Sequence, residues 1–95
     1  MSLGQRIADP GADDGIEELV DELRGVVAGL SDGKLVAVQI EADAHLFDYG
    51  YVNSLSAVMF LAHILERHGV EIEDVALIEE FTTLRAVAER IREAR

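Results

Sequence analysis

The sequence predicts an all-α protein of four helices, three long and one short, with a long loop after the first helix. Apolar residues recur at helical spacing in three stretches, helix-capping and helix-ending residues stand between them, and the chain has a single proline. Its 95 residues, of which 49% are hydrophobic, suffice for one domain with a modest core. We expect residues 1–12 to be a flexible lead-in and residues 13–95 to form the domain.

The first helix is predicted over residues 13–29. Asp13 and Asp14 suit its N-terminal end, where acidic side chains cap free amides and face the positive end of the helix dipole. Gly29 and the turn-forming cluster at residues 31–33 are predicted to end it. Its apolar stripe consists of Ile16, Leu19, Val20, Leu23, Val26, Val27 and Leu30.

The loop that follows contains a stretch of alternating β-branched residues at 35–40. A single short strand without a partner is not stable, so we predict an ordered loop or short turn instead. This turn is expected to hold Val36, Val38 or Ile40 against the core. Two later residues of the loop are predicted to be buried anchors, namely Leu46 and Phe47.

The second helix is predicted to begin at Asn53 or Ser54 and to run to about His68, with Gly69 as a left-handed cap. The residues expected to face the core are Ala57, Phe60, Leu61 and Ile64. Apolar residues also cover much of the remaining surface, namely Leu55, Val58, Met59, Ala62 and Leu65. We expect part of this surface to face a partner protein.

The short helix is predicted over residues 73–79, and the last helix begins at Thr82 or Thr83, both of which are good caps. The residues of the last helix expected to point inward are Leu84, Val87, Ala88 and Ile91. Basic residues gather at its end, where cations complement the helix dipole, namely Arg90, Arg92 and Arg95.

Composition excludes several classes of function. The chain has no cysteine, which rules out disulfides, thiolate metal sites and thiol catalysis by the bare polypeptide. The net charge of −11 disfavours nucleic acid and anionic membranes, and serves either solubility or the steering of basic partners. No apolar run reaches the roughly 18 residues of a membrane span, and residues 1–10 do not form a secretory signal. We therefore expect a monomer of the cytoplasm that binds neither membrane nor nucleic acid.

Catalytic and metal sites are not predicted. Asp48, Ser54 and His63 are the residue types of a hydrolytic triad, but His63 follows Ser54 by nine residues on one helix, about 13 Å away. The three histidines, His45, His63 and His68, lack a metal-binding spacing and are expected at the surface. The acidic residues Glu41, Asp43 and Asp48 do not fit a calcium loop.

Residues 48–55 resemble the attachment site of acyl and peptidyl carrier proteins. The stretch Asp-Tyr-Gly-Tyr-Val-Asn-Ser-Leu is similar to the family pattern Asp-x-Gly-x-x-Asp-Ser-Leu. The likeness extends over about residues 13–93, because the order of helices, the Gly-Val-Glu-Ile after the second helix and the Phe-Thr-Thr-Leu that opens the last one also agree. The resemblance implies an acyl-carrier-like four-helix bundle of the discrete, stand-alone type.

The resemblance also implies a cofactor and partners. In this family a transferase joins phosphopantetheine from coenzyme A to the serine, here Ser54, and the new thiol holds an acyl or aminoacyl group as a thioester. The transferase supplies the base and a magnesium ion, so the carrier is not itself an enzyme. Further implied partners are the enzyme that loads the group and the downstream synthase or modifying enzymes.

Two departures from the family pattern bear on docking. Asn53 replaces the usual Asp, which keeps a helix cap but removes a negative charge that the transferase often contacts. Met59 and Leu65 occupy positions that are commonly acidic in fatty-acid carriers, while Glu66 remains. We therefore expect more apolar docking and a role in polyketide, nonribosomal peptide or related metabolism. The residues expected to contact partners are Asp48, Asn53, Leu55, Val58, Met59, Ala62, Leu65 and Glu66.

The sequence also allows other interpretations of these residues. Ser54 could serve only as a helix cap, and Met59 and Leu65 could belong to the core. Tyr49 and Tyr51 either brace the loop or touch a partner. The rival function is an unmodified helical interaction module whose apolar second helix binds a groove.

Overall fold

The computed structural model describes residues 15–94, which form four α-helices, one short 3-10 turn and no β-strand. The elements are α1 (Ile16–Leu30), η3 (Ala37–Gln39), α2 (Ser54–His68), α3 (Asp74–Glu79) and α4 (Leu84–Ala94). The predicted all-α bundle of three long helices and one short helix is confirmed. The expected lead-in at residues 1–12 lies outside the described residues. None of the described helices is long and apolar enough to span a bilayer.

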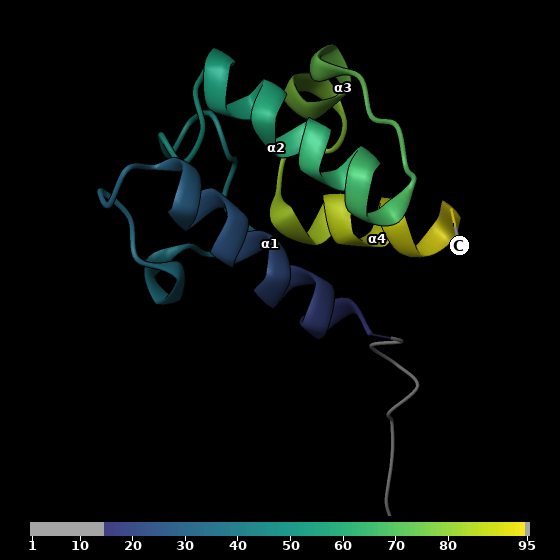
Figure 1. Cartoon of the computed structure of the whole chain (residues 1–95), viewed down its shortest axis with the longest axis horizontal. Helices are drawn as coiled ribbons and strands as arrows, with labels where there is room; N and C mark the ends of the chain where they lie inside the picture. The colour runs from purple at the N-terminus through teal and green to yellow at the C-terminus, as the bar shows by residue number, and fades with distance from the viewer. Residues whose placement is uncertain (1–14, 95) are drawn as a thin grey trace, which may run out of the picture.

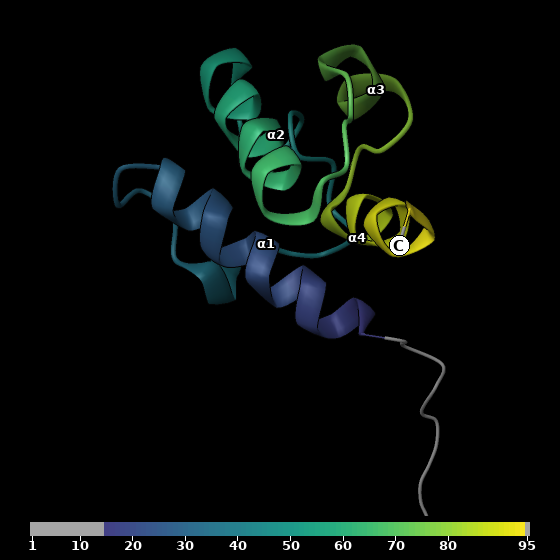
Figure 2. The ribbon, with the colours of Figure 1, turned by 45° about the vertical axis from the view of Figure 1, so that its right-hand side comes forward.

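The helices form an antiparallel arrangement around α1. Helix α1 packs against both α2 and α4, and α3 packs against α2. Figure 1 and Figure 2 show α1 and α2 running in opposite directions, so that the end of α1 lies near the start of α2. Helix α3 lies on the side of α2 that faces away from α1. The long connection between α1 and α2 therefore begins and ends at the same end of the bundle.

The core is formed by the apolar stripes that the sequence predicts. The fully buried residues include Val20, Leu23 and Val27 of α1, Phe60 and Ile64 of α2, Leu77 of α3, and Leu84, Val87, Ala88 and Ile91 of α4. Val26, Leu30 and Leu61 are partly buried and pack against this cluster. Burial of each such large side chain contributes roughly 1.5–3 kcal/mol, and this burial stabilises helices that are too short to form alone.

The bounds of α1 differ from the prediction. The helix begins at Ile16 after Gly15, while Asp13 and Asp14 lie outside the described residues. Gly29 lies inside the helix and does not end it. The helix ends one residue later, at Leu30, where the Ser31 hydroxyl donates a hydrogen bond of 2.6 Å to the carbonyl of Ala28 and closes the last turn.

The other three helices keep close to their predicted bounds. Gly69 ends α2 in the left-handed conformation, with φ of 69°. The short predicted helix is α3, one residue shorter than expected at its start. The hydroxyl of Thr83 accepts a hydrogen bond of 3.1 Å from the amide of Ala86 and so caps the start of α4. At the end of α4, Arg92 lies in the last turn, and Arg95 is outside the described residues.

The long loop is ordered around one buried side chain from its first half. Ile40 is buried, whereas Val36 and Val38 are exposed, so one of the three predicted candidates reaches the core. The predicted absence of a strand is confirmed among the described residues, since the alternating stretch forms the turn η3. Arg24 of α1 donates a hydrogen bond of 2.8 Å from Nε to the carbonyl of Ile40, which holds the loop against α1.

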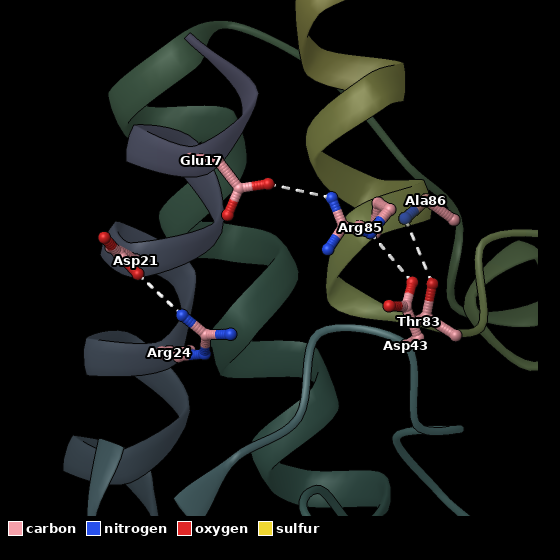
Figure 3. Close-up of polar contacts among 7 residues, drawn as sticks. All are labelled: Glu17, Asp21, Arg24, Asp43, Thr83, Arg85 and Ala86. Carbon is pink, nitrogen blue, oxygen red and sulfur yellow. Dashed lines mark hydrogen bonds and ion pairs between the residues drawn. The ribbon is translucent and has the colours of Figure 1, made fainter. Parts of the chain in front are cut away.

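The second half of the loop is bound to the start of α4. The amide of Arg85 donates to the carbonyl of Ala42 at 3.0 Å, and the amide of Leu46 donates to the carbonyl of Thr82 at 2.8 Å. The Arg85 side chain bonds Asp43 of the loop and Glu17 of α1, at 2.8 and 2.9 Å (Figure 3). These contacts join three segments that are distant in the sequence.

Two glycine substitutions with opposite expected effects test the helix assignments. Gly69→Ala should lower the free energy of unfolding by about 1 kcal/mol, because φ of 69° disfavours any residue with a Cβ atom. Gly25→Ala, inside α1 with nothing within 4 Å of a new Cβ, should raise it by about 0.5–1 kcal/mol. Urea unfolding measures both. Equal effects of the two substitutions would contradict the assignment of Gly69 as a cap.

Candidate functional site

The turn before α2 is built on the backbone of Leu46. Its carbonyl accepts hydrogen bonds from the amides of Tyr51 and Val52, at 2.9 and 3.2 Å. Gly50 lies at the tip of this turn with φ of 74°, a conformation that glycine adopts without strain, and its amide donates to the carbonyl of Phe47. Leu46 is fully buried and Phe47 is half-buried, so both predicted anchors contact the core.

The two tyrosines beside Gly50 have different surroundings. The Tyr51 hydroxyl donates to the carbonyl of Gln39 at 3.4 Å and accepts from the amide of Glu41 at 3.3 Å, so Tyr51 braces the two halves of the loop. Tyr49 is 63% exposed and stacks at a tilt on Tyr51, with ring centroids 5.7 Å apart. Of the two interpretations from the sequence, bracing holds for Tyr51.

Asn53 caps α2 in the way that its residue type predicts. Its side-chain Oδ1 accepts from the amide of Ser56, and the Ser56 hydroxyl accepts from the amide of Asn53, both at 2.9 Å. This reciprocal pair is a capping box, in which serine takes the place of the more common glutamate. The cap orients the first turn of α2 and fixes where Ser54 begins the helix.

Ser54 is the first residue of α2 and is exposed. Within the described chain its hydroxyl makes no hydrogen bond, so it is neither a cap nor a core residue. The first turn of α2 contains no acidic residue, and amides at a helix start carry the positive end of the dipole. This position tolerates a negatively charged group on the hydroxyl.

A family model described as a phosphopantetheine attachment site matches residues 21–91. The chain belongs to this family. No curated protein and no solved structure matches it. As a member, the protein is a carrier that bears phosphopantetheine covalently on a serine, and it is not itself an enzyme. Carriers of this family work with a phosphopantetheinyl transferase and with loading and synthase enzymes.

The structure exposes every residue that the sequence singles out for docking. Four apolar side chains of α2 are at least half exposed, namely Leu55, Val58, Met59 and Leu65. The exposed residues that complete the set are Asp48, Asn53, Ala62 and Glu66. Met59 and Leu65 are therefore not core residues. Sequence analysis missed Val75 and Ile78 of the adjoining α3, which are also about half exposed. The sequence signal for this pair was their spacing of three residues, which places two apolar side chains on the same face of a short helix.

The histidines correct one expectation from the sequence. The His68 side chain is buried, 6% exposed, and its Nε2 lies 2.9 Å from Glu22 Oε2. Nε2 of His63 lies 3.1 Å from the same oxygen, and Arg67 is within 3.9 Å. The expectation of surface histidines is wrong for His68, because antiparallel packing of α1 and α2 covers it. No group of metal-binding side chains occurs in the described part of the chain.

The carboxyl of Glu22 has an altered pKa. Partial burial raises it, but hydrogen bonds from His63 and His68 and the charges of His68 and Arg67 outweigh burial and lower the pKa below its ordinary value of 4.5. Glu22 therefore remains charged under mildly acidic conditions. Its position makes it a clasp between α1 and the last turns of α2.

The Glu22 clasp predicts a specific pH dependence of stability. Because its folded-state pKa is lowered, the charged carboxyl adds stability above about pH 4.5, and that contribution is lost as the pH falls through the lowered pKa. Glu22→Gln should lower the free energy of unfolding by about 1 kcal/mol near pH 7 and by less below pH 4 or so.

Denaturant unfolding from about pH 7 to about pH 3 measures the difference between the variant and the wild type. Glu71→Gln is the matched control, since Glu71 is exposed outside the helices. It should follow the wild type at every pH. A Glu22→Gln difference that stays constant over the range would contradict the clasp.

Proposed function

We propose that Ser54 carries the phosphopantetheine arm. The family match contains three serines, at positions 31, 54 and 56. The hydroxyl of Ser31 donates to the carbonyl of Ala28 and accepts from the amide of Leu35. The hydroxyl of Ser56 belongs to the capping box. Ser54 is exposed, and its hydroxyl makes no such bond within residues 15–94, which supports it as the modified residue.

The residues around Ser54 position its hydroxyl but do not deprotonate it. Among the described residues no side-chain base is hydrogen-bonded to the Ser54 hydroxyl. The transferase must therefore accept the hydroxyl proton as the serine oxygen bonds to the phosphorus of phosphopantetheine, the phosphoanhydride bond of coenzyme A breaks and adenosine 3′,5′-bisphosphate leaves. Gly50 and the Asn53 cap leave Ser54 exposed at the start of α2, where the active site of another protein can reach it. When bound, the arm supplies the thiol that holds a thioester.

We further propose that partners dock on the apolar surface of α2. This surface consists of Leu55, Val58, Met59, Ala62 and Leu65, with Glu66 next to it on the same helix; Asp48 is exposed in the turn before α2. Exposed apolar side chains on a small domain with a net charge of −11 favour brief contacts with partners that combine an apolar patch and basic surroundings. The reduced acidity of α2 supports a dedicated pathway, such as polyketide or nonribosomal peptide assembly.

Intact mass tests the attachment site. After incubation with coenzyme A and a broad-specificity transferase, the wild type should gain one phosphopantetheine, and Ser54→Ala should gain none. Ser56→Ala is the matched control and should be modified, because its backbone amide still reaches Asn53. No mass gain with several transferases would favour the unmodified interaction module. If Ser54→Ala gained the mass of one phosphopantetheine, the attachment residue would be another residue and the proposal for Ser54 would be wrong.

A charge placed on α2 tests the docking surface. Val58→Glu puts a carboxylate at a position that is 56% exposed and one turn beyond Ser54. It should weaken binding by the cognate loading enzyme about tenfold, since a charge must then be desolvated in an apolar contact. Val38→Glu, at an 85% exposed position of η3, makes the same change away from α2 and should leave binding unchanged. Isothermal titration calorimetry measures the affinity of each variant for the enzyme. Circular dichroism checks that both variants keep the helicity of the wild type. If Val58→Glu bound the loading enzyme with unchanged affinity, the proposal that this enzyme docks on the apolar surface of α2 would be wrong.

A further inference from the structure

The imidazole of His45 lies at the start of the turn that leads to Ser54. Its Nδ1 accepts hydrogen bonds from the backbone amides of Phe47 and Asp48, both at 3.2 Å. The carbonyl of His45 also accepts from the amide of Tyr49, at 3.0 Å. One residue therefore binds three successive amides of the turn. Asn, Asp, Ser and Thr are the side chains that most often cap free amides in this way, so a histidine here is unusual.

The two bonds to Nδ1 require a neutral ring. A ring nitrogen accepts a hydrogen bond only when it carries no proton, so the hydrogen of the neutral ring lies on Nε2. If Nδ1 gained a proton, it would become a donor that faces two other donors, and both hydrogen bonds would be lost. The side chain of His45 is 29% exposed, so protons from solvent reach it. Histidine is the side chain whose charge ordinarily changes between about pH 5 and 8.

A second partner for the ring lies beside it. Asp48 Oδ1 is 3.9 Å from Nδ1 of His45. Within residues 15–94 it belongs to the one carboxyl within 4.0 Å of either ring nitrogen. A protonated ring would therefore be attracted to the carboxylate of Asp48, whereas a neutral ring binds the amide of the same residue.

Other charged groups near this turn are engaged elsewhere. Asp43, two residues before His45, bonds Arg85 of α4 at 2.8 Å, and Arg85 also bonds Glu17 of α1 at 2.9 Å. Further acidic residues of the loop and of the end of α3 form no ion pair with the ring in the described chain, namely Glu41, Glu79 and Glu80. Asp48 is therefore the charged group that competes for a proton-bearing His45.

We propose that His45 is a positioning residue for the modification of Ser54, and that its neutral ring holds the turn in the form that the transferase recognises. The inference rests on the proposed function, because the reaction that it serves is the attachment of phosphopantetheine. His45 takes no part in the bond changes at the serine oxygen. It acts through the turn and through Asp48.

Backbone contacts connect the cap with the start of α2. Leu46, the residue after His45, accepts a hydrogen bond of 3.2 Å from the amide of Val52. Val52 is followed by Asn53, which caps α2 and so fixes where Ser54 begins the helix. Loss of the bonds to His45 would therefore loosen the segment that orients the first turn of α2.

Protonation of His45 would weaken recognition by the transferase in two ways. The freed turn would have to be ordered again when the transferase docks, which costs binding free energy. The ring would also move toward Asp48, an exposed carboxylate among the proposed docking residues, and would offset its charge toward a basic partner. Both effects act on binding, so we expect a higher KM with little change in kcat.

Steady-state kinetics of the full chain with coenzyme A and a broad-specificity transferase test this role. His45→Asn keeps a side-chain acceptor for the amides but does not change charge in this pH range, so at about pH 8 it should match the wild type. His45→Ala removes the acceptor and should raise KM about fivefold, with kcat within about twofold. At about pH 5.5 the KM of the wild type should be about fivefold above that of His45→Asn.

The ratio of wild type to His45→Asn cancels the pH dependence of the transferase itself. His63→Gln is the matched control, because it removes another histidine, one that contacts Glu22 on the far turns of α2. This variant should keep the pH dependence of the wild type.

Nuclear magnetic resonance of the isotope-labelled chain measures the cap without any transferase. Between about pH 8 and about pH 5.5, the amide resonances of Phe47 and Asp48 should shift together with the ring resonance of His45 in the wild type. In His45→Asn these two amides should not shift over the same range. Circular dichroism checks that each variant keeps the helicity of the wild type, and if His45→Ala loses it, the comparison with His45→Asn decides.

Three results would overturn the inference alone. The first is a KM that depends on pH equally in the wild type and in His45→Asn. The second is a folded His45→Ala that is modified with the KM of the wild type. The third is a pair of amides at Phe47 and Asp48 that do not follow the ring of His45. If the wild type takes up no phosphopantetheine at any pH, the proposed function fails, and the positioning role fails with it.

Discussion

Leu46 is the residue on which the geometry of the site depends. Its side chain is fully buried, its amide donates to the carbonyl of Thr82, and its carbonyl accepts from Tyr51 and Val52. One residue thus fixes the end of the long loop to the connection before α4 and starts the turn that leads to α2. Since a buried backbone group without a partner is costly, both of its polar groups must be satisfied in this way. Ser54 is placed by this anchor, although the two residues do not touch.

Helices α1 and α2 contribute differently to the bundle. Helix α1 provides the buried stripe and the charged contacts, including Glu22 with the histidines of α2 and Glu17 with Arg85. Helix α2 buries only three residues fully and leaves the rest of its apolar surface open. The bundle is therefore held mainly through α1, and α2 is left to expose both Ser54, the proposed attachment residue, and an apolar surface.

Charge and apolar exposure have complementary consequences for partner choice. The net charge of −11 opposes contact between two copies of the protein, even though several large apolar side chains face solvent. The same charge favours partners with basic surroundings. Because the first turn of α2 has no acidic residue, a phosphate on Ser54 would meet the positive end of the helix dipole without a carboxylate beside it in that turn.

The sequence by itself determined the helices, the cap at Asn53, the end of α2 at Gly69 and the position of Ser54. These features depend on residues within a few positions of one another, through hydrogen bonds and side-chain contacts along one helix. The sequence also indicated Leu46 as buried, but not that its amide would bond Thr82. Only the tertiary structure decided that Ile40 and not Val38 is buried and that the His68 side chain is covered beside Glu22. Each of these results depends on how α1, the loop and α2 pack against one another, and no local spacing encodes contacts such as Arg24 with Ile40 or Glu22 with His68, which are 16 and 46 positions apart.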